Sequence, residues 1–148
     1  MPMDKKTLHI MNSAPIVVSL GTILVVDDNP IIQRSIYFVL RDRGYKVIAT
    51  GEIAEALNIV RKEKLNLILL DINFPPDDSY GGARDGFWAV EWMRRMDELR
   101  GVPIVIISSE DPAVASPRAQ AAGAAGYLHK PISKDSLTLT VAELLKAS

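Results

Sequence analysis

Five short apolar runs recur along the chain, and apolar residues at helical spacing follow each of them. The runs cover residues 22–26, 45–49, 65–72, 104–107 and 126–129. The helical patterns cover residues 30–44, 52–62, 85–99, 116–123 and 133–146. A strand followed by a helix, repeated five times with short connections, is typical of an α/β fold. We therefore expect a doubly wound, parallel five-stranded sheet, (βα)5, with helices on both faces and three α/β/α layers.

Prolines and a glycine mark the expected helix ends. Asn29 and Pro30 predict the start of the first helix, because proline in the first turn loses no hydrogen bond, and Gly44 fits its C-terminal cap. Ser116 and Pro117 fit the N-cap and first turn of a short fourth helix. Proline inside a longer helix costs about 3 kcal/mol, so this helix is expected to begin or kink near Pro117.

The third helical pattern carries two tryptophans one turn apart, Trp88 and Trp92, continued by Met96 and Leu99. We expect Trp92 to pack into the core and Trp88 to lie at its edge. The alternative is an exposed stripe that binds a partner protein.

Composition indicates one soluble, globular domain. The chain has 148 residues, 48% of them hydrophobic and 24% charged, and a formal net charge of -1. This charge gives no electrostatic footprint for nucleic acid, and the absence of cysteine excludes disulfides and thiolate zinc sites. Residues 1–20 are interpreted as a partly disordered extension and residues 21–148 as the domain. No secretory signal or membrane span is indicated, so we expect a cytoplasmic protein.

Chemically active side chains follow the apolar runs at the point where each run ends. The carboxyl ends of parallel strands share one edge of the sheet, where open α/β sheets bind their ligands. Carboxylates that converge there require a cation, and a hard divalent ion with oxygen ligands, Mg2+ or Mn2+, fits best. The side chains in question are those of Asp27, Asp28, Asp71, Ser108 and Lys130.

These residues favour phosphoryl transfer to a carboxylate. With a cation to screen the negative charge, Asp71 could attack phosphorus and form an acyl phosphate. Lys130 could neutralise one phosphoryl oxygen, and Ser108 could donate a hydrogen bond to another. Ser109 is the competing hydroxyl, although its spacing to Tyr127 fits less well than that of Ser108.

From about Thr22 onward, the chain resembles a response-regulator receiver domain, with the flavodoxin-like fold and a likeness to the chemotaxis receiver. The motifs that carry the resemblance are Asp27-Asp28, Asp71 within Leu-Leu-Asp-Ile-Asn, Pro75, Asp85-Gly86, Ser108, the segment 123–127 and Lys130-Pro131.

The resemblance implies a set of roles. Asp71 would accept a phosphoryl group from a histidine kinase or a histidine phosphotransfer protein. Mg2+ would be held by Asp28, Asp71 and the backbone carbonyl of Asn73, with Asp27 acting through water. Ser108 and Tyr127 would form the switch pair.

Two further features are implied by the same resemblance. The Lys130-Pro131 peptide bond would be cis, which proline tolerates. Asn73 and Glu110 occupy the two positions that tune phosphoryl lifetime in this family, and their pairing favours rapid self-dephosphorylation.

Some residues keep a second interpretation. Tyr127 could be an inert aromatic at a strand edge, and His129 is more simply a structural strand residue than a relay. The stretch from Pro75 to Asp85 is about seven residues longer than is usual for the family. It is either a tolerated surface loop or a lid that selects partners and shields the acyl phosphate.

The leading hypothesis is a signalling receiver that is not a turnover enzyme on external substrates. Its expected partners are a kinase or phosphotransfer donor and a downstream protein target, with no nucleic acid and no membrane, and its expected state is a monomer or weak dimer. With three residues after the last helix, a stand-alone receiver and a fragment of a hybrid kinase are equally compatible with the sequence.

Other classes of protein fit less well. A receiver-like interaction module that switches without phosphate conflicts with the intact acids and Lys130. A metal-dependent phosphohydrolase would carry a second carboxylate where Asn73 stands, and a flavin module would carry a phosphate loop after the first strand.

Overall fold

The computed structural model describes residues 19–73 and 86–146. The expected extension, apart from residues 19 and 20, lies outside the described residues, and so does the whole of the long stretch from residue 75 to 85. Within the described residues, none of the helices has both the length and the apolar character needed to cross a membrane.

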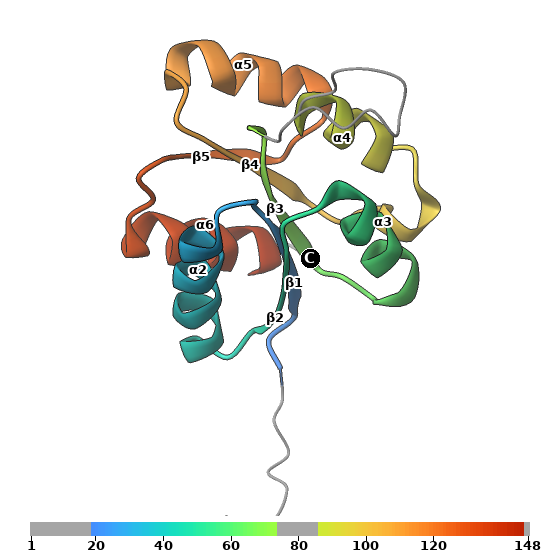
Figure 1. Cartoon of the computed structure of the whole chain (residues 1–148), viewed down its shortest axis with the longest axis vertical. Coiled ribbons are helices and arrows are strands. Elements are labelled where there is room, and N and C mark those ends of the chain that lie inside the picture. The colour runs from blue at the N-terminus through green and yellow to red at the C-terminus, as the bar shows by residue number, and fades with distance from the viewer. Residues whose placement is uncertain (1–18, 74–85, 147–148) are drawn as a thin grey trace, which may run out of the picture.

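Strands and helices alternate along the described chain (Figure 1). The strands are β1 (Thr22–Val26), β2 (Lys46–Thr50), β3 (Leu67–Asp71), β4 (Ile104–Ser108) and β5 (Gly126–His129). The helices are α2 (Pro30–Asp42), α3 (Ile53–Lys62), α4 (Gly86–Met93), α5 (Pro112–Ala122) and α6 (Lys134–Lys146), with the 3-10 helix η2 (Asp97–Leu99) after α4.

The strands form one parallel sheet in the order β2-β1-β3-β4-β5. Because successive strand residues face opposite sides, each of the three central strands contributes to two cores. Leu24, Ile68 and Ile106 face the core beneath α3, α4 and α5, whereas Val25 and Leu69 face the core beneath α2 and α6. The predicted fold class, a doubly wound sheet between two helical layers, is confirmed.

The first and last helices begin as the sequence predicts. The Asn29 side chain accepts hydrogen bonds from the backbone N–H groups of Ile31 (2.9 Å) and Ile32 (3.3 Å), which caps α2. Ser133 accepts one from the N–H of Ser136 (3.0 Å) at the start of α6. These caps therefore fix the residues at which α2 and α6 begin.

The predicted start of the fourth helix was wrong, whereas its predicted end near Gly123 is confirmed. This helix, α5, begins at Pro112 and runs through Pro117. Asp111 caps it by accepting a hydrogen bond from the N–H of Ala113 at 3.0 Å. Both Asp111-Pro112 and Ser116-Pro117 pair a capping residue with proline, but the cap hydrogen bond forms at Asp111, so the helix begins there and Pro117 occupies its interior.

The third helix is shorter than predicted, and of its two tryptophans only Trp88 lies as expected, at the edge of the core. α4 ends at Met93, and the turn of η2 brings Leu99 into the core; a 3-10 helix keeps the apolar spacing of three that resembled a continuous helix. Met93 is fully buried, whereas Trp88 is half-buried against the core. Trp92 is half-buried and meets Trp88 edge to face, so the expectation that Trp92 fills the core was wrong.

Candidate functional site

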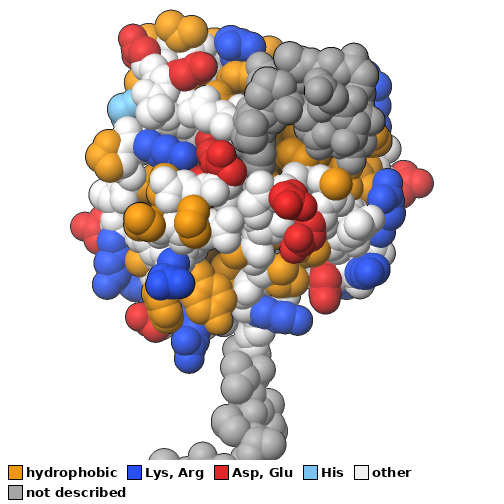
Figure 2. All heavy atoms as spheres, viewed as in Figure 1, with side chains coloured by type: hydrophobic (Ala, Val, Ile, Leu, Met, Phe, Trp, Pro, Cys, Tyr) orange, Lys and Arg blue, Asp and Glu red, His pale blue; other side chains and the backbone are white. Residues whose placement is uncertain are grey.

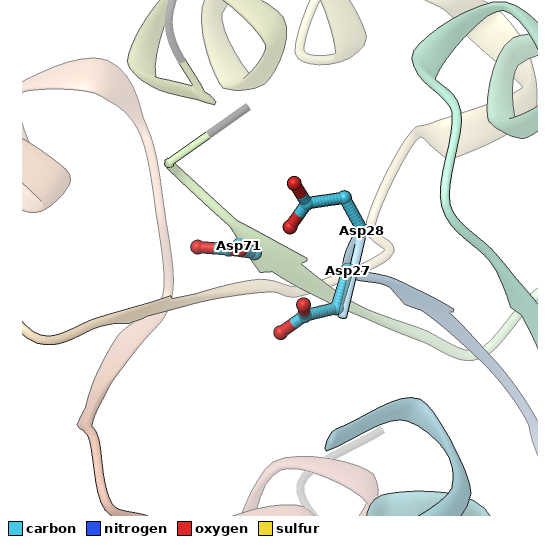
Figure 3. A group of neighbouring side chains, drawn as sticks. All are labelled: Asp27, Asp28 and Asp71. Atoms are coloured by element: carbon cyan, nitrogen blue, oxygen red, sulfur yellow. The ribbon is translucent and has the colours of Figure 1, made fainter. Parts of the chain in front are cut away.

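Three carboxylates meet at the carboxyl ends of two neighbouring interior strands, β1 and β3. Asp71 is the last residue of β3, and Asp27 and Asp28 directly follow β1, which pairs with β3. Their side chains point into one space (Figure 3). One oxygen from each lies within 4.8 Å of the other two. The structure therefore brings together the acids that the sequence predicted at this edge.

The three acids differ in exposure. Asp27 is fully buried and Asp71 is 1% exposed, whereas Asp28 is exposed at the mouth of the site. In the space-filling view, acidic side chains reach the surface near the middle of one face, beside Lys or Arg side chains (Figure 2). A small ion or an anionic donor can therefore approach from solvent on the side of Asp28.

Lys130 supplies the positive charge of the site. It follows β5, and its Nζ lies 3.1 Å from Asp27 Oδ2 and 3.3 Å from Asp71 Oδ2. Its side chain is 17% exposed. One ammonium thus lies between two buried carboxylates, and the group as a whole keeps an excess of negative charge.

Asp71 is held in place by its own chain. Its Oδ1 accepts a hydrogen bond from the backbone N–H of Asn73 at 2.9 Å. Burial raises the pKa of Asp71 above its usual value, and repulsion from Asp27 acts in the same direction. The Asn73 N–H and Lys130 oppose this rise in pKa. A cation in the site would oppose it further.

The residues present fit a hard divalent cation. Asp27 Oδ1 accepts a hydrogen bond from the N–H of Asn29 at 2.8 Å, but Asp27 Oδ2 is buried and makes no hydrogen bond with any of the described residues. Lys130 is near enough to this oxygen for an ion pair without the orientation of a hydrogen bond. A buried anionic oxygen of this kind, beside two further carboxylates, matches the oxygen ligands that Mg2+ prefers.

The predicted switch residues are joined through the loop that follows β4. Ser108 is fully buried, and its Oγ accepts a hydrogen bond from the N–H of Glu110 at 3.0 Å. The Tyr127 hydroxyl donates to the carbonyl of Glu110 at 2.7 Å and lies 3.3 Å from that of Ser108. Tyr127 is half-buried at the edge of the core. Tyr127 therefore holds the Ser108–Glu110 turn in place. The side chain of Glu110 is exposed.

The remaining predicted positions lie close to the site. Asn73 is exposed two residues after Asp71, and the Lys130-Pro131 peptide bond is cis. Ser109 is exposed, with its carbonyl 3.3 Å from His129 Nε2, so His129 contacts the loop.

Sequence reasoning missed Gln33. Its side-chain amide donates a hydrogen bond to the backbone carbonyl of Asp27, and so ties α2 to the end of β1. Nothing in the residue type predicts this contact, because it depends on the path of α2 over the strand. The Asn29 cap had a signal, since asparagine before proline favours a helix start.

Comparisons with known proteins agree with this geometry. A family model described as the response regulator receiver domain matches residues 23–142. The chain is 31% identical to the alginate biosynthesis transcriptional regulatory protein AlgB of Pseudomonas syringae pv. tomato over 85% of its length, but it spans only 26% of AlgB. It is 25% identical to protein PilH of Pseudomonas aeruginosa, covering 85% of this chain and 98% of PilH.

Solved structures show the same architecture. The chemotaxis response regulator CheY4 of Vibrio cholerae superposes with a TM-score of 0.73 at 28% identity, covering 84% of this chain and 98% of CheY4. The receiver domain of the sensor histidine kinase PA1611 of Pseudomonas aeruginosa superposes with a TM-score of 0.72 at 26% identity, covering 85% and 98%. That structure has a magnesium ion coordinated in its active-site cleft.

Proposed function

Because the chain belongs to the response regulator receiver family, whose members are phosphoacceptors in two-component signalling, we propose that Asp71 is its phosphoacceptor. One observation carries the proposal: Asp71 ends β3 beside two other carboxylates and 3.3 Å from the ammonium of Lys130. The donor would be a phosphohistidine on a kinase or phosphotransfer protein.

The transfer needs little from the protein beyond position and charge. A carboxylate oxygen of Asp71 forms the new bond to phosphorus, while the bond from phosphorus to the donor imidazole breaks and its electron pair stays on the imidazole nitrogen. Lys130 would neutralise a phosphoryl oxygen, and the Ser108 hydroxyl, which now accepts from the Glu110 N–H, would donate a hydrogen bond to another. Tyr127 would follow the movement of that turn.

Mg2+ is the proposed cofactor, and Mn2+ would fit the same ligands. We infer that Asp28, Asp71 and the Asn73 carbonyl hold the ion, with Asp27 acting through water. Bound there, it would screen the carboxylates from the incoming phosphoryl group.

A groove beside the site suits the donor protein. Its volume is about 500 Å³, and it runs between α2 and the loop before α6, lined by Ile31, Ile132 and Leu137 and ending at Lys130. Ile31 is 78% exposed, and hydrophobic side chains reach the surface over α2 (Figure 2). We propose that an apolar helical face of the donor packs here and brings its imidazole to Asp71.

The test is intact-mass spectrometry after incubation with Mg2+ and acetyl phosphate. The expected result is one labile adduct of a single phosphoryl group, absent with EDTA and absent in Asp71→Asn. Asp97→Asn, which changes an exposed acid remote from the site, should keep the adduct. An adduct that persists in Asp71→Asn would contradict the assignment of the acceptor.

Two refinements use the same assay. Rapid decay of the adduct would support the proposed tuning by Asn73 and Glu110, and a lifetime of many hours would contradict it. If the folded protein takes no phosphoryl group from acetyl phosphate or from any kinase, the result would favour the alternative, an interaction module regulated without phosphorylation.

The downstream target, the oligomeric state and the cytoplasmic location stay predictions.

A further inference from the structure

The first residue of α4 rests on the residue that follows Asp71. The N–H of Gly86 donates to the carbonyl of Ile72 at 3.1 Å. A Cβ at Gly86 would lie 2.3 Å from Ile72 Cα, which is closer than real carbon contacts allow. Only glycine therefore permits this approach, and the end of β3 and the start of α4 must move together.

Helix α4 lies beside α5 (Figure 1), and two side-chain contacts join α4 and the residue that follows it to α5. Next to Gly86, the ring of Phe87 lies beneath the guanidinium of Arg118, with Arg118 Cζ 4.2 Å from the ring centroid. Farther along, the stem of Arg94 lies against Gly123 at the end of α5; a Cβ there would be 2.8 Å from Arg94 Cγ. The contacts with α5 thus lie at Arg118, in the second half of the helix, and at its C-terminal end.

Helix α5 packs only weakly against the rest of the fold. Its buried residues are the alanines Ala115, Ala119 and Ala122, which bury little area. Pro117 in its interior cannot donate a backbone hydrogen bond. A helix attached in this way can shift without breaking a packed core, so its few long side chains determine where it lies.

We propose that Arg118 is a positioning residue that couples α5 to the phosphoacceptor strand through Phe87. The route runs from Asp71 through Ile72, Gly86 and Phe87 to Arg118, and each step is a covalent bond or a contact described above. It is separate from the Ser108–Tyr127 connection. The inference rests on the proposed function, because a phosphoryl group on Asp71 is the input, and a displacement of α5 relative to the sheet is the output.

The chain offers a separate reporter for each helix. Its only two tryptophans, Trp88 and Trp92, lie on α4, so their fluorescence reports on that helix. It has no cysteine, so Ala121→Cys, at an exposed position of α5, accepts a single fluorine-19 label. Beryllofluoride with Mg2+ serves as a stable mimic of the phosphoryl group.

In the labelled parent protein, both signals should change at the same beryllofluoride concentration. In Arg118→Met, the tryptophan change should persist while the fluorine shift falls at least twofold. Arg118→Lys, which keeps a cation over the ring, should recover most of the shift. Phe87→Leu should lower the shift as Arg118→Met does, and the double variant should lose no more than either single variant.

Several results would overturn the inference. A full fluorine shift in Arg118→Met removes the coupling role, and a full shift in Phe87→Leu shows that Arg118 acts through another contact. A fluorine shift without any tryptophan change takes α4 out of the route. If the folded parent protein shows neither signal although acetyl phosphate still forms the adduct on Asp71, the inference alone fails. If the adduct is absent as well, the proposed function fails with it.

Discussion

Lys130 lies between two buried carboxylates, and its replacement tests how much the site depends on a single cation. In Lys130→Met, Asp27 and Asp71 would stay buried without a positive partner. Removing one partner of a buried ion pair costs about 3 kcal/mol. We therefore expect a loss of that size in the free energy of unfolding, measured with urea in EDTA. Mg2+ should restore a large part of it.

Lys134→Met is the matched control for this experiment. Lys134 lines the same groove but is exposed, so its loss should change the free energy of unfolding by less than about 0.5 kcal/mol. Equal losses for the two variants would mean that the charge of Lys130 stabilises the fold no more than the charge of a surface lysine does.

Single residues also show how much of the site could be predicted from the sequence. Asp27, Asp28, Asp71 and Lys130 could be placed because each follows an apolar run, and parallel strands bring such positions to one edge. Gln33 could not be placed, because its contact with the Asp27 carbonyl depends on how α2 lies on β1. Strand periodicity fixes where a strand ends but says nothing about the side chains of a neighbouring helix.

At the scale of elements, α5 is the helix that departs most from its sequence pattern. Pro117 is the sixth residue of this helix, so it leaves the carbonyl of Ala113 without the usual donor, and its ring crowds that carbonyl. Pro117→Ala restores the donor, although it also frees the unfolded chain. We expect a net gain of about 2 kcal/mol in the free energy of unfolding, together with slower amide exchange in α5.

Pro112→Ala provides the comparison, because a proline in the first turn loses no helical hydrogen bond. Its free energy of unfolding should stay the same or fall slightly. A gain equal to that of Pro117→Ala would contradict the assignment of strain to the helix interior.

The two wrong helix predictions share a physical cause. For α5, the helix could begin at Pro112 or at Pro117, five residues later. The cap at Asp111 selects the first, and a pattern of apolar residues does not reveal such a cap. For α4, the 3-10 turn kept Met93, Met96 and Leu99 at intervals of three, so the helical pattern outlasted the helix. Apolar spacing predicts which residues face the core, but hydrogen bonds decide where the helix ends.

For the whole molecule, the site is a junction of three strands, so a cation bound there should stabilise the entire sheet. At 100 times its dissociation constant, a ligand adds about 2.7 kcal/mol to the free energy of unfolding. We expect Mg2+ to raise the melting temperature in this way, as measured by thermal unfolding followed with circular dichroism. Asp28→Asn should weaken the effect, because it removes one carboxylate ligand.

Glu52→Gln controls for a general effect of charge, since Glu52 is an exposed acid outside the cluster of three. It should leave the Mg2+-induced rise in melting temperature unchanged. An identical rise in Asp28→Asn and in Glu52→Gln would show that the ion acts elsewhere on the surface.

The order in which the site residues leave the ribosome has a consequence for the cell. Asp27, Asp28 and Asp71 emerge early, but Lys130 follows the last strand to be made, β5, which takes the edge of the sheet beside β4. A nascent chain interrupted before that point carries the acids without their counter-charge and without the strand that borders β4. If Asp71 is the acceptor, a chain interrupted before Lys130 lacks the cation that phosphoryl transfer would use, so it would not compete with the folded receiver for phosphoryl groups.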